Sequence, residues 1–367
     1  MDRILEAMYR FLYYKYLQLI IEPSYLLMPI VYLNRTIESF HEEQAYHLFR
    51  FQKTDLRRLM KALRIPDIVC TKGRNKFTGE EVFLFSLMRL CSLTTLDELA
   101  KTYFGRDYTA WSRAFKWFLV HLYTNFHDLM CDNLDYWQPY FKECAAAIQN
   151  KLAAFGLHYD PEAFGVCGFI DDHCFATCRP CGPKETVEQW MAAQMVQQAF
   201  YNGWKSKHGL KWQTFDLPNG MTADMFGPRS LRRNNLRLLV WSKLDPRMHD
   251  CQLLSQILYL IYGDSIFPQL QHIRSSHKGN NLTDRQILEN RVLKKVRICI
   301  EWHYGHLASL FPFIDYKRNV KLLQQPCELI YFAASLLRNC HCTLYGNQTS
   351  SYFKCTPPSL ESFMQVE

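Results

Sequence analysis

The order of strand-like and helix-like segments after residue 160 constrains the fold of this 367-residue chain more than any other feature. An apolar, β-rich segment comes first, FGVCGFIDDHCFATC, and a predicted helix at 182–200 separates it from two alternating segments that meet at Asn219-Gly220, a strong hairpin signal. A segment of helical spacing, SLRRNNLRLLVWSKL, then precedes a buried strand, ILYLIYGDSIFP, that ends at Asp264. A long helix containing Glu301 is predicted last. This order predicts one α/β unit.

Acidic residues occupy matching places in that order. Three strands, a helix, a strand and a helix form the layout of an RNase H-like nuclease core, a mixed-sheet α/β fold whose first and fourth strands lie side by side. Asp171 lies in the first strand, Asp264 ends the fourth, and the last helix carries Glu301. Three such carboxylates can hold two Mg²⁺ or Mn²⁺ ions roughly 3.5–4 Å apart. The sequence therefore predicts a metal-binding carboxylate set made of Asp171, Asp264 and Glu301.

Capping boxes mark the helices of the region before the α/β unit. Thr78-Gly-Glu-Glu81 and Thr95-Leu-Asp-Glu98 each open an apolar run of helical period. The second run continues to Leu122 as two helices joined by a turn at Gly105, which is the outline of a helix-turn-helix. A plain helical hairpin in an all-helical lobe is the alternative. If the second helix reads DNA, its basic contacts are Arg106, Arg113 and Lys116.

Composition and helix breaks divide the chain into four parts. Residues 1–70 are predicted to form a helical extension, and 71–160 the helix-turn-helix-like lobe. The nuclease core spans 161–345, and 346–367 form a C-terminal tail. The first apolar run, MDRILEAMYRFLYYKYLQLIIEP, carries charges and lacks a small-residue cleavage site, which indicates an amphipathic helix rather than a signal peptide.

Charge and cysteine content limit the partners and the compartment. Forty-three basic residues against 35 acidic ones give a net charge of +8, which permits a polyanionic partner without requiring one. Fourteen cysteines in 367 residues fall below the density of small secreted scaffolds, so reduced thiols in an intracellular protein are expected. No stretch of about 18 uncharged apolar residues occurs, and no membrane span is predicted.

Two basic clusters accompany the predicted strands. The basic residues of the first, in GWKSKHGLK, are Lys205, Lys207, His208 and Lys211, and those of the second, in RSLRRNN, are Arg229, Arg232 and Arg233. DNA backbone phosphates are the ligands that such clusters bind, and a solvated surface is the alternative. Arg297 stands four residues before Glu301 on the expected long helix, so it is predicted to pair with that carboxylate or with DNA, or merely to stabilise the helix.

The segment HCFATCRPC combines one histidine with three cysteines, which are His173, Cys174, Cys178 and Cys181. A structural zinc ion needs four ligands, but consecutive residues of a strand point to opposite faces, so His173 and Cys174 do not suit one ion. Packed free thiols are therefore favoured over a structural zinc.

Five segments in order resemble the Harbinger/PIF-type DDE transposases, a eukaryotic group of cut-and-paste nucleases. They are GFIDDHCFATCRP, FYNGWKSKHGLKWQTFDLPNGM, FGPRSLRRNNLRLLVWSKL, YGDSIFP and VRICIEWHYGHL, and FAASLLRNC resembles the closing helix of that family. The resemblance spans residues 78–340. It implies metal-dependent cleavage and joining of DNA strands, a nuclear location and a separate Myb-like DNA-binding partner. A homo-oligomer is compatible with it.

One position departs from the family pattern. Where family members usually have a His-Asp pair, this chain has Asn234-Asn235. If that aspartate is the second metal ligand, the site is one charge short, and the chain is a domesticated, catalytically inactive relative that binds DNA or a protein. We expect Asp264 to be the second acid instead, because it follows the fourth strand. A helical interaction protein with an incidental α/β part is a third hypothesis.

Overall fold

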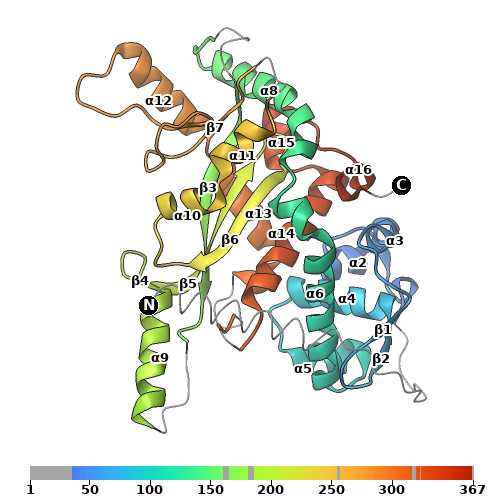
Figure 1. The fold of residues 1–367 in the computed structure, drawn as a ribbon. Helices are drawn as coiled ribbons and strands as arrows, with labels where there is room; N and C mark the ends of the chain where they lie inside the picture. The colour runs from blue at the N-terminus through green and yellow to red at the C-terminus, as the bar shows by residue number, and fades with distance from the viewer. Residues whose placement is uncertain are drawn as a thin grey trace. The chain divides into compact units, whose positions relative to one another are not determined.

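The computed structural model of the chain describes residues 35–159, 165–180, 186–253, 257–315, 320–322 and 324–365 (Figure 1). These residues divide into two compact units: 35–126 with 311–313 form one, and the other described residues from 127 onward form the second. The domain boundaries expected after residues 70 and 160 stay predictions. The amphipathic helix predicted at the N-terminus lies outside the described residues, as does Cys181.

The first unit is mostly helical. Its elements are η1 (Ile37–Ser39), α2 (Glu42–Phe49), α3 (Lys53–Ala62), β1 (Ile68–Cys70), β2 (Lys76–Thr78), α4 (Gly79–Cys91), α5 (Leu96–Leu99), η2 (Ala100–Phe104) and the first part of α6 (Tyr108–Cys131). Strands β1 and β2 pair antiparallel. Helix α4 begins where predicted: the Thr78 hydroxyl accepts from the Glu81 backbone N–H, and the Glu81 carboxylate accepts from that of Thr78.

The predicted helix-turn-helix segment has a different local form. Helix α5 is a single turn capped by Thr95, and the π-helical turn η2 follows it directly. Gly105 ends this segment at a φ of 70°, a left-handed conformation that favours glycine. The Asp107 carboxylate then accepts a hydrogen bond from the Thr109 backbone N–H as α6 begins. Helix α6 packs into the core, because Trp111 and many of its other apolar side chains are buried.

A mixed sheet forms the centre of the second unit. Its strands are β3 (Val166–Thr177), β4 (Tyr201–Asn202), β5 (Lys207–Asp216), β6 (Thr222–Ser230), β7 (Leu260–Tyr262) and β8 (Ile273–Arg274). Strands β6, β5 and β3 are antiparallel neighbours in that order, and β7 and β8 continue the sheet in parallel with β3. The short β4 pairs with the beginning of β5. The first and fourth predicted strands, β3 and β7, are therefore adjacent, as the sequence predicts.

Helices pack around this sheet. They are α7 (Leu134–Trp137), η3 (Gln138–Tyr140), α8 (Phe141–Ala154), α9 (Val187–Phe200), α10 (Asn235–Ser242), α11 (Leu244–Asp250), α12 (Asp284–Val296), α13 (Cys299–Leu310), α14 (Cys327–Tyr345), α15 (Gln348–Phe353) and α16 (Leu360–Met364). The short η4 (Pro312–Ile314) belongs mostly to the first unit. Helix α9 is the predicted insertion. The long helix expected around Glu301 is two helices, α12 and α13, which separate at Arg297 and Ile298. The expected tail contains two helices that bury Phe353 and Phe363.

Side chains of β3 alternate between two faces of the sheet. His173 stacks on Tyr304 of α13 with ring centroids 4.4 Å apart, so the odd-numbered positions around it, including Asp171, point to what we call the α13 face. Asp172 accepts a hydrogen bond from Gln213, and Gln213 in turn accepts one from Ser242 of α10. The even-numbered positions therefore point to the opposite side, the α10 face.

Candidate active site

Two of the predicted acids come together where the parallel pairing of β3 with β7 ends. In the register of β3 and β7, Phe169 is the partner of Tyr262, so Asp171 and Asp264 each follow that pair by two residues. Asp264 lies in the turn after β7, where its side chain accepts a hydrogen bond from the Ile266 backbone N–H at 2.9 Å. The structure thus brings Asp171 and Asp264 to neighbouring positions at one edge.

Charge and burial act together on Asp171. Burial raises the pKa of Asp171 above its ordinary value, and the negative charge of Asp264 raises it further. Arg297 opposes both effects, because its Nη1 donates to Asp171 Oδ2 at 2.9 Å. Arg297 is the C-cap of α12 and does not belong to the helix that carries Glu301. The expectation that Arg297 and Glu301 share one helix is therefore wrong, and the arginine pairs with Asp171.

Glu301 is exposed in the first turn of α13. Tyr304 follows three residues later on nearly the same side of the helix, and its hydroxyl lies 2.8 Å from the Thr214 hydroxyl of β5. Thr214 is the register partner of Asp171, so the first turns of α13 lie on the same face as that acid. Across the described ranges, however, no three His, Cys, Asp or Glu side chains are grouped closely enough to hold a metal ion.

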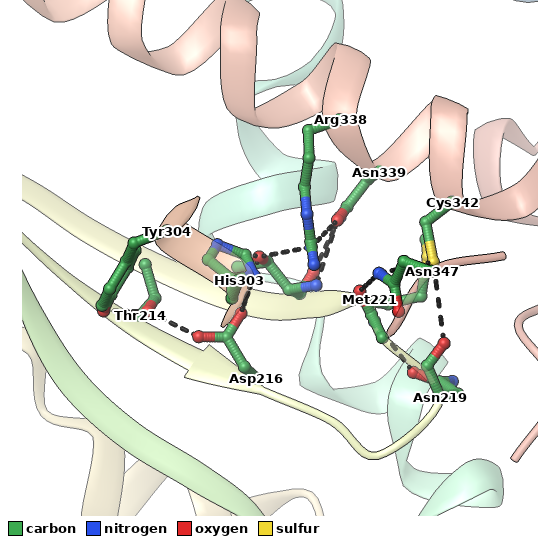
Figure 2. A network of polar contacts seen from close by, with 12 residues as sticks. Thr214, Asp216, Asn219, Met221, His303, Tyr304, Arg338, Asn339, Cys342 and Asn347 are labelled. Carbon is green, nitrogen blue, oxygen red and sulfur yellow. Dashed lines mark hydrogen bonds and ion pairs between the residues drawn. The ribbon is translucent and has the colours of Figure 1, made fainter. Parts of the chain in front are cut away.

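A buried polar network fixes α13 against the sheet (Figure 2). The Asp216 carboxylate accepts hydrogen bonds from the hydroxyls of Thr214, at 2.7 Å, and Thr222, at 2.8 Å. Its Oδ1 lies 3.0 Å from Nδ1 of His303 on α13. Burial raises the pKa of Asp216 to about 6 and lowers the pKa of His303 well below its ordinary value. These contacts determine where α13 holds its first turn, which carries Glu301.

Helix α14 completes the network shown in Figure 2. The Asn339 side chain accepts a hydrogen bond from the Thr222 N–H at 3.0 Å and donates one to the Thr222 carbonyl at 2.9 Å. The buried Arg338 donates to Asn339 Oδ1 at 3.2 Å, and its positive charge partly offsets the effect of burial on the pKa of Asp216. The sequence offered one signal for this role, an Arg-Asn pair within the apolar run FAASLLRNC.

On the α10 face lies a second carboxylate, the buried Asp172, which the sequence patterns did not predict as a site residue. Its Oδ2 lies 3.9 Å from Nζ of Lys211, which donates to Asn235 Oδ1 at 3.0 Å and to the Arg233 carbonyl at 2.6 Å. Burial raises the pKa of Asp172 to about 7, although Lys211 opposes the shift. Asn235 begins α10 and, through Lys211, belongs to the face opposite Asp171. The sequence did contain a signal for this second acid. Asp171 and Asp172 are consecutive, and consecutive strand residues point to opposite faces, so one of the two must lie on the α10 face.

The first basic cluster is only partly exposed. Lys205 and Lys207 are exposed and His208 is half-buried. The Lys205 ammonium donates to Cys174 Sγ at 2.7 Å. Lys211, by contrast, is 4% exposed and bound to the groups of the α10 face, so its charge is not presented to a DNA backbone. The burial of Lys211 does not support the prediction that it contacts a DNA phosphate.

The second basic cluster lies around Trp241. Arg232 is exposed, whereas Arg229 and Arg233 are half-buried. The guanidinium carbons of these two arginines lie 5.5 Å and 6.0 Å from the centroid of the Trp241 ring. Arginine over an aromatic face keeps its charge while covering apolar surface. This cluster therefore combines structural packing with surface charge.

The three candidate contacts of the first unit also differ. Arg113 is exposed and Lys116 is half-buried. Arg106 is only 6% exposed: its Nη1 donates to the Lys76 carbonyl at 2.6 Å, and its Nη2 lies 3.5 Å from Glu81 Oε2. Arg106 thus joins the beginning of α4 to β2, and its burial does not support the predicted role as a DNA contact.

The cysteine-rich segment spreads across both faces of the sheet. The half-buried ring of His173 stacks on Tyr304 on the α13 face, while Cys174 contacts Lys205. Cys178 follows the end of β3, where its backbone N–H donates to the Val320 carbonyl at 2.8 Å. This placement agrees with the expectation that His173 and Cys174 do not face one ion.

Comparison with known proteins gives one match. Residues 186–339 match a family described as the DDE superfamily endonuclease. The matched span contains Asp264 and Glu301 and begins after Asp171. No curated protein and no solved structure matched the chain. Among the described residues, no helix is both long and apolar enough to cross a membrane. The family match supports a DDE transposase-type family and a transposase or nuclease function for this region.

Proposed function

We propose that the chain is a Harbinger/PIF-like DDE transposase with an RNase H-like core, which cuts and joins DNA strands with Asp171, Asp264 and Glu301. This proposal rests mainly on the adjacency of Asp171 and Asp264, which each follow the last paired residues of β3 and β7 by two positions. Helix α13 adds Glu301 on the same face as Asp171. The strand order β6-β5-β3-β7-β8 supports the RNase H-like assignment, because it joins an antiparallel meander to two parallel strands.

The donor set suits hard divalent cations. Asp171, Asp264 and Glu301 offer only carboxylate oxygens, which Mg²⁺ and Mn²⁺ prefer, and the mutual repulsion of Asp171 and Asp264 favours a cation between them. When bound, two such ions supply activation of the attacking water or 3′-hydroxyl and stabilisation of the leaving oxygen. Arg297 currently balances the charge of Asp171, so it competes with a cation for the same oxygen.

The environment of Asn235 supports Asp264 as the second acid. Asn235 accepts a hydrogen bond from Lys211, whose ammonium lies near Asp172 on the α10 face. A carboxylate at position 235 would therefore meet a lysine on the face opposite Asp171. Asp264, by contrast, acts directly on the pKa of Asp171. The replacement of the family His-Asp pair thus leaves the proposed acid set intact.

A second candidate function is DNA or protein binding without cleavage. Two observations favour it: the described residues contain no group of three metal-ligating side chains, and Arg297 already neutralises Asp171. In that case the acids would be remnants of a nuclease. The two candidates differ in one measurable property, metal-dependent cleavage.

The DNA contacts proposed for either function are the exposed or half-buried members of the basic clusters. These are Lys205, Lys207, His208, Arg229, Arg232, Arg233, Arg113 and Lys116. A nuclear location, a Myb-like DNA-binding partner and assembly of several copies are part of the same proposal, and they rest on the resemblance to the Harbinger/PIF group.

A nicking assay on supercoiled DNA tests the proposal. The protein is incubated with Mg²⁺ or Mn²⁺, with and without a Myb-like partner, and compared with Asp171→Asn, Asp264→Asn and Glu301→Gln. Each substitution removes one negative charge while barely changing side-chain volume. We expect each variant to lose nicking while it keeps its circular-dichroism spectrum and most of its DNA affinity.

The variant Asn235→Asp separates the two candidates for the second acid. If the natural protein is inactive and Asn235→Asp cuts DNA, Asp264 is not a sufficient second acid and the natural protein is a binding relative. If neither protein cuts with either metal and with the partner present, the endonuclease proposal fails. Cleavage by the natural protein that depends on all three acids supports it.

A further inference from the structure

A cavity of about 580 Å³ lies beside the proposed acids in the second unit. Strand β7, the segment from Arg274 to Lys278 and helix α12 supply most of its lining. Its volume falls within the range of small-molecule sites in proteins, about 300–1,000 Å³. The cavity is therefore large enough for one nucleotide.

Part of the cavity lining is apolar and aromatic. Leu258, Leu260 and Leu293 line it, together with the rings of Tyr159 and Tyr262. Such a surface suits the flat face of a nucleobase, which stacks on aromatic rings without regard to its sequence identity.

Other lining residues are polar or basic, and most of them come from residues 274–278. His277 Nε2 lies 2.7 Å from Glu289 Oε2, so this histidine already has an anionic partner. Arg274 donates from Nη1 to the carbonyls of Leu270 and Ile273. Lys278 is exposed, and the described part of the chain offers it no hydrogen bond or ion pair. The lining thus carries a cation that is available to an external anion.

Tyr262 connects the cavity to the proposed acids. Its side chain is 2% exposed, and its hydroxyl lies 3.1 Å from the Ser276 hydroxyl within the cavity lining. Tyr262 is the last residue of β7 and the register partner of Phe169, so Asp264 and Asp171 each follow this pair by two residues. The cavity therefore borders the edge where Asp171 and Asp264 meet.

We propose that this cavity binds a single nucleotide, with the base against Leu258, Leu260 and the half-buried Tyr159 and the phosphate at Lys278. The ligand must contact both kinds of lining residue. A free phosphate would not contact the apolar residues, and an apolar ligand would not contact Lys278. That the nucleotide belongs to a DNA strand held next to the acids rests on the proposed function. Its chemistry as a nucleotide does not.

Binding of deoxyadenosine monophosphate to the full chain tests the proposal in EDTA, so that metal-dependent chemistry does not contribute. Isothermal titration compares this nucleotide with deoxyadenosine and with inorganic phosphate. Lys278→Met removes the cation, Leu258→Trp fills the apolar half from a position that is 47% exposed, and Lys142→Met is the matched control on α8. A charge-assisted hydrogen bond contributes about tenfold in affinity.

We expect the nucleotide to bind more tightly than either fragment. Lys278→Met should weaken the nucleotide by about threefold to tenfold and leave deoxyadenosine unchanged, because only the phosphate meets the lysine. Leu258→Trp should weaken both ligands, and Lys142→Met neither. A natural protein that binds no nucleotide, or variants at Lys278 and Leu258 that bind it as the natural protein does, would overturn the proposal.

Competition with a short single-stranded oligonucleotide identifies the source of the nucleotide. Displacement of the mononucleotide assigns the cavity to a strand of DNA, and its persistence assigns the cavity to free nucleotides. This result does not depend on cleavage. Nucleotide binding without nicking would support the nucleotide site and contradict the endonuclease function. Nicking without nucleotide binding would support the endonuclease function and contradict the nucleotide site.

Discussion

Asp171 and Asp172 are consecutive in β3, yet each carboxylate faces its own basic side chain across a different face of the sheet. Asp171 Oδ2 is 2.9 Å from Arg297 Nη1, and Asp172 Oδ2 is 3.9 Å from Lys211 Nζ. The first pair lies at the edge where Asp264 follows β7, and the second is enclosed with Asn235 beneath α10. One backbone step therefore separates the proposed catalytic acid from a buried structural one.

This separation predicts different effects of removing the two carboxylates. Asp171→Asn should abolish metal-dependent nicking. Asp172→Asn should retain nicking but lower the free energy of unfolding by about 2 kcal/mol, because Lys211 loses its buried counter-ion. Nicking assays and urea denaturation of both variants check this. Loss of nicking in a folded Asp172→Asn protein would assign Asp172 to the active site.

Arg297 should control the affinity of the acids for a divalent ion. In Arg297→Gln the Asp171 carboxylate loses the guanidinium that shares its Oδ2, so Mn²⁺ should bind about tenfold more tightly. Isothermal titration measures this affinity without any substrate. Arg291→Gln, an exposed change on the same helix α12, is the control and should leave the affinity unaltered. Equal affinities in all three proteins would show that Arg297 does not compete with the ion.

The buried network around Asp216 predicts a pH dependence of stability. Burial raises the pKa of Asp216 from 3.8 to about 6, so the folded protein holds this proton more tightly than the unfolded chain. Its contribution to stability is therefore fully present below 3.8 and is lost as the pH rises through about 6. Asp216→Asn should reduce this decline by on the order of 3 kcal/mol. Urea denaturation between pH 4 and 7 measures the change, and identical pH profiles would contradict it.

The exposed lysines of the β4–β5 turn should contribute to DNA affinity through phosphate contact. Lys205→Gln and Lys207→Gln are each expected to weaken binding at low salt and to reduce the magnitude of the salt slope by about 0.9 per lost contact. Lys142→Gln on α8 is the charge-matched control. Anisotropy titrations from low to physiological salt give the slopes. Slopes that do not change would mean that these lysines are solvated and that DNA binds elsewhere.

Local patterns predicted much of the fold. The Asn219-Gly220 turn, where Gly220 has a φ of 85°, separates β5 and β6 as expected, and the capping residues Thr78 and Thr95 begin α4 and α5. These signals act within a few residues, so a single sequence contains them completely. The adjacency of β3 and β7 followed from the order of the segments alone.

Long-range contacts account for what the sequence did not predict. The segment around Arg297 and Ile298 contains no glycine or proline, so its apolar period suggested one continuous helix. In the structure α12 ends at Arg297, whose side chain pairs with Asp171, a residue 126 positions earlier. The burial of Lys211 and Arg106 likewise depends on partners that come from other segments, such as Asn235 and Glu81. Neither composition nor spacing could distinguish these side chains from surface cations.

The break between α12 and α13 assigns two roles, lining the cavity and holding Glu301, to separate helices. Helix α12 lines the cavity through Glu289 and Leu293, whereas α13 is anchored to the sheet by His303 and Tyr304. A continuous helix would transmit any rotation of its first half to Glu301, but two short ones do not. In the proposed function, the residues of α12 that line the cavity can therefore change while the position of Glu301 stays the same.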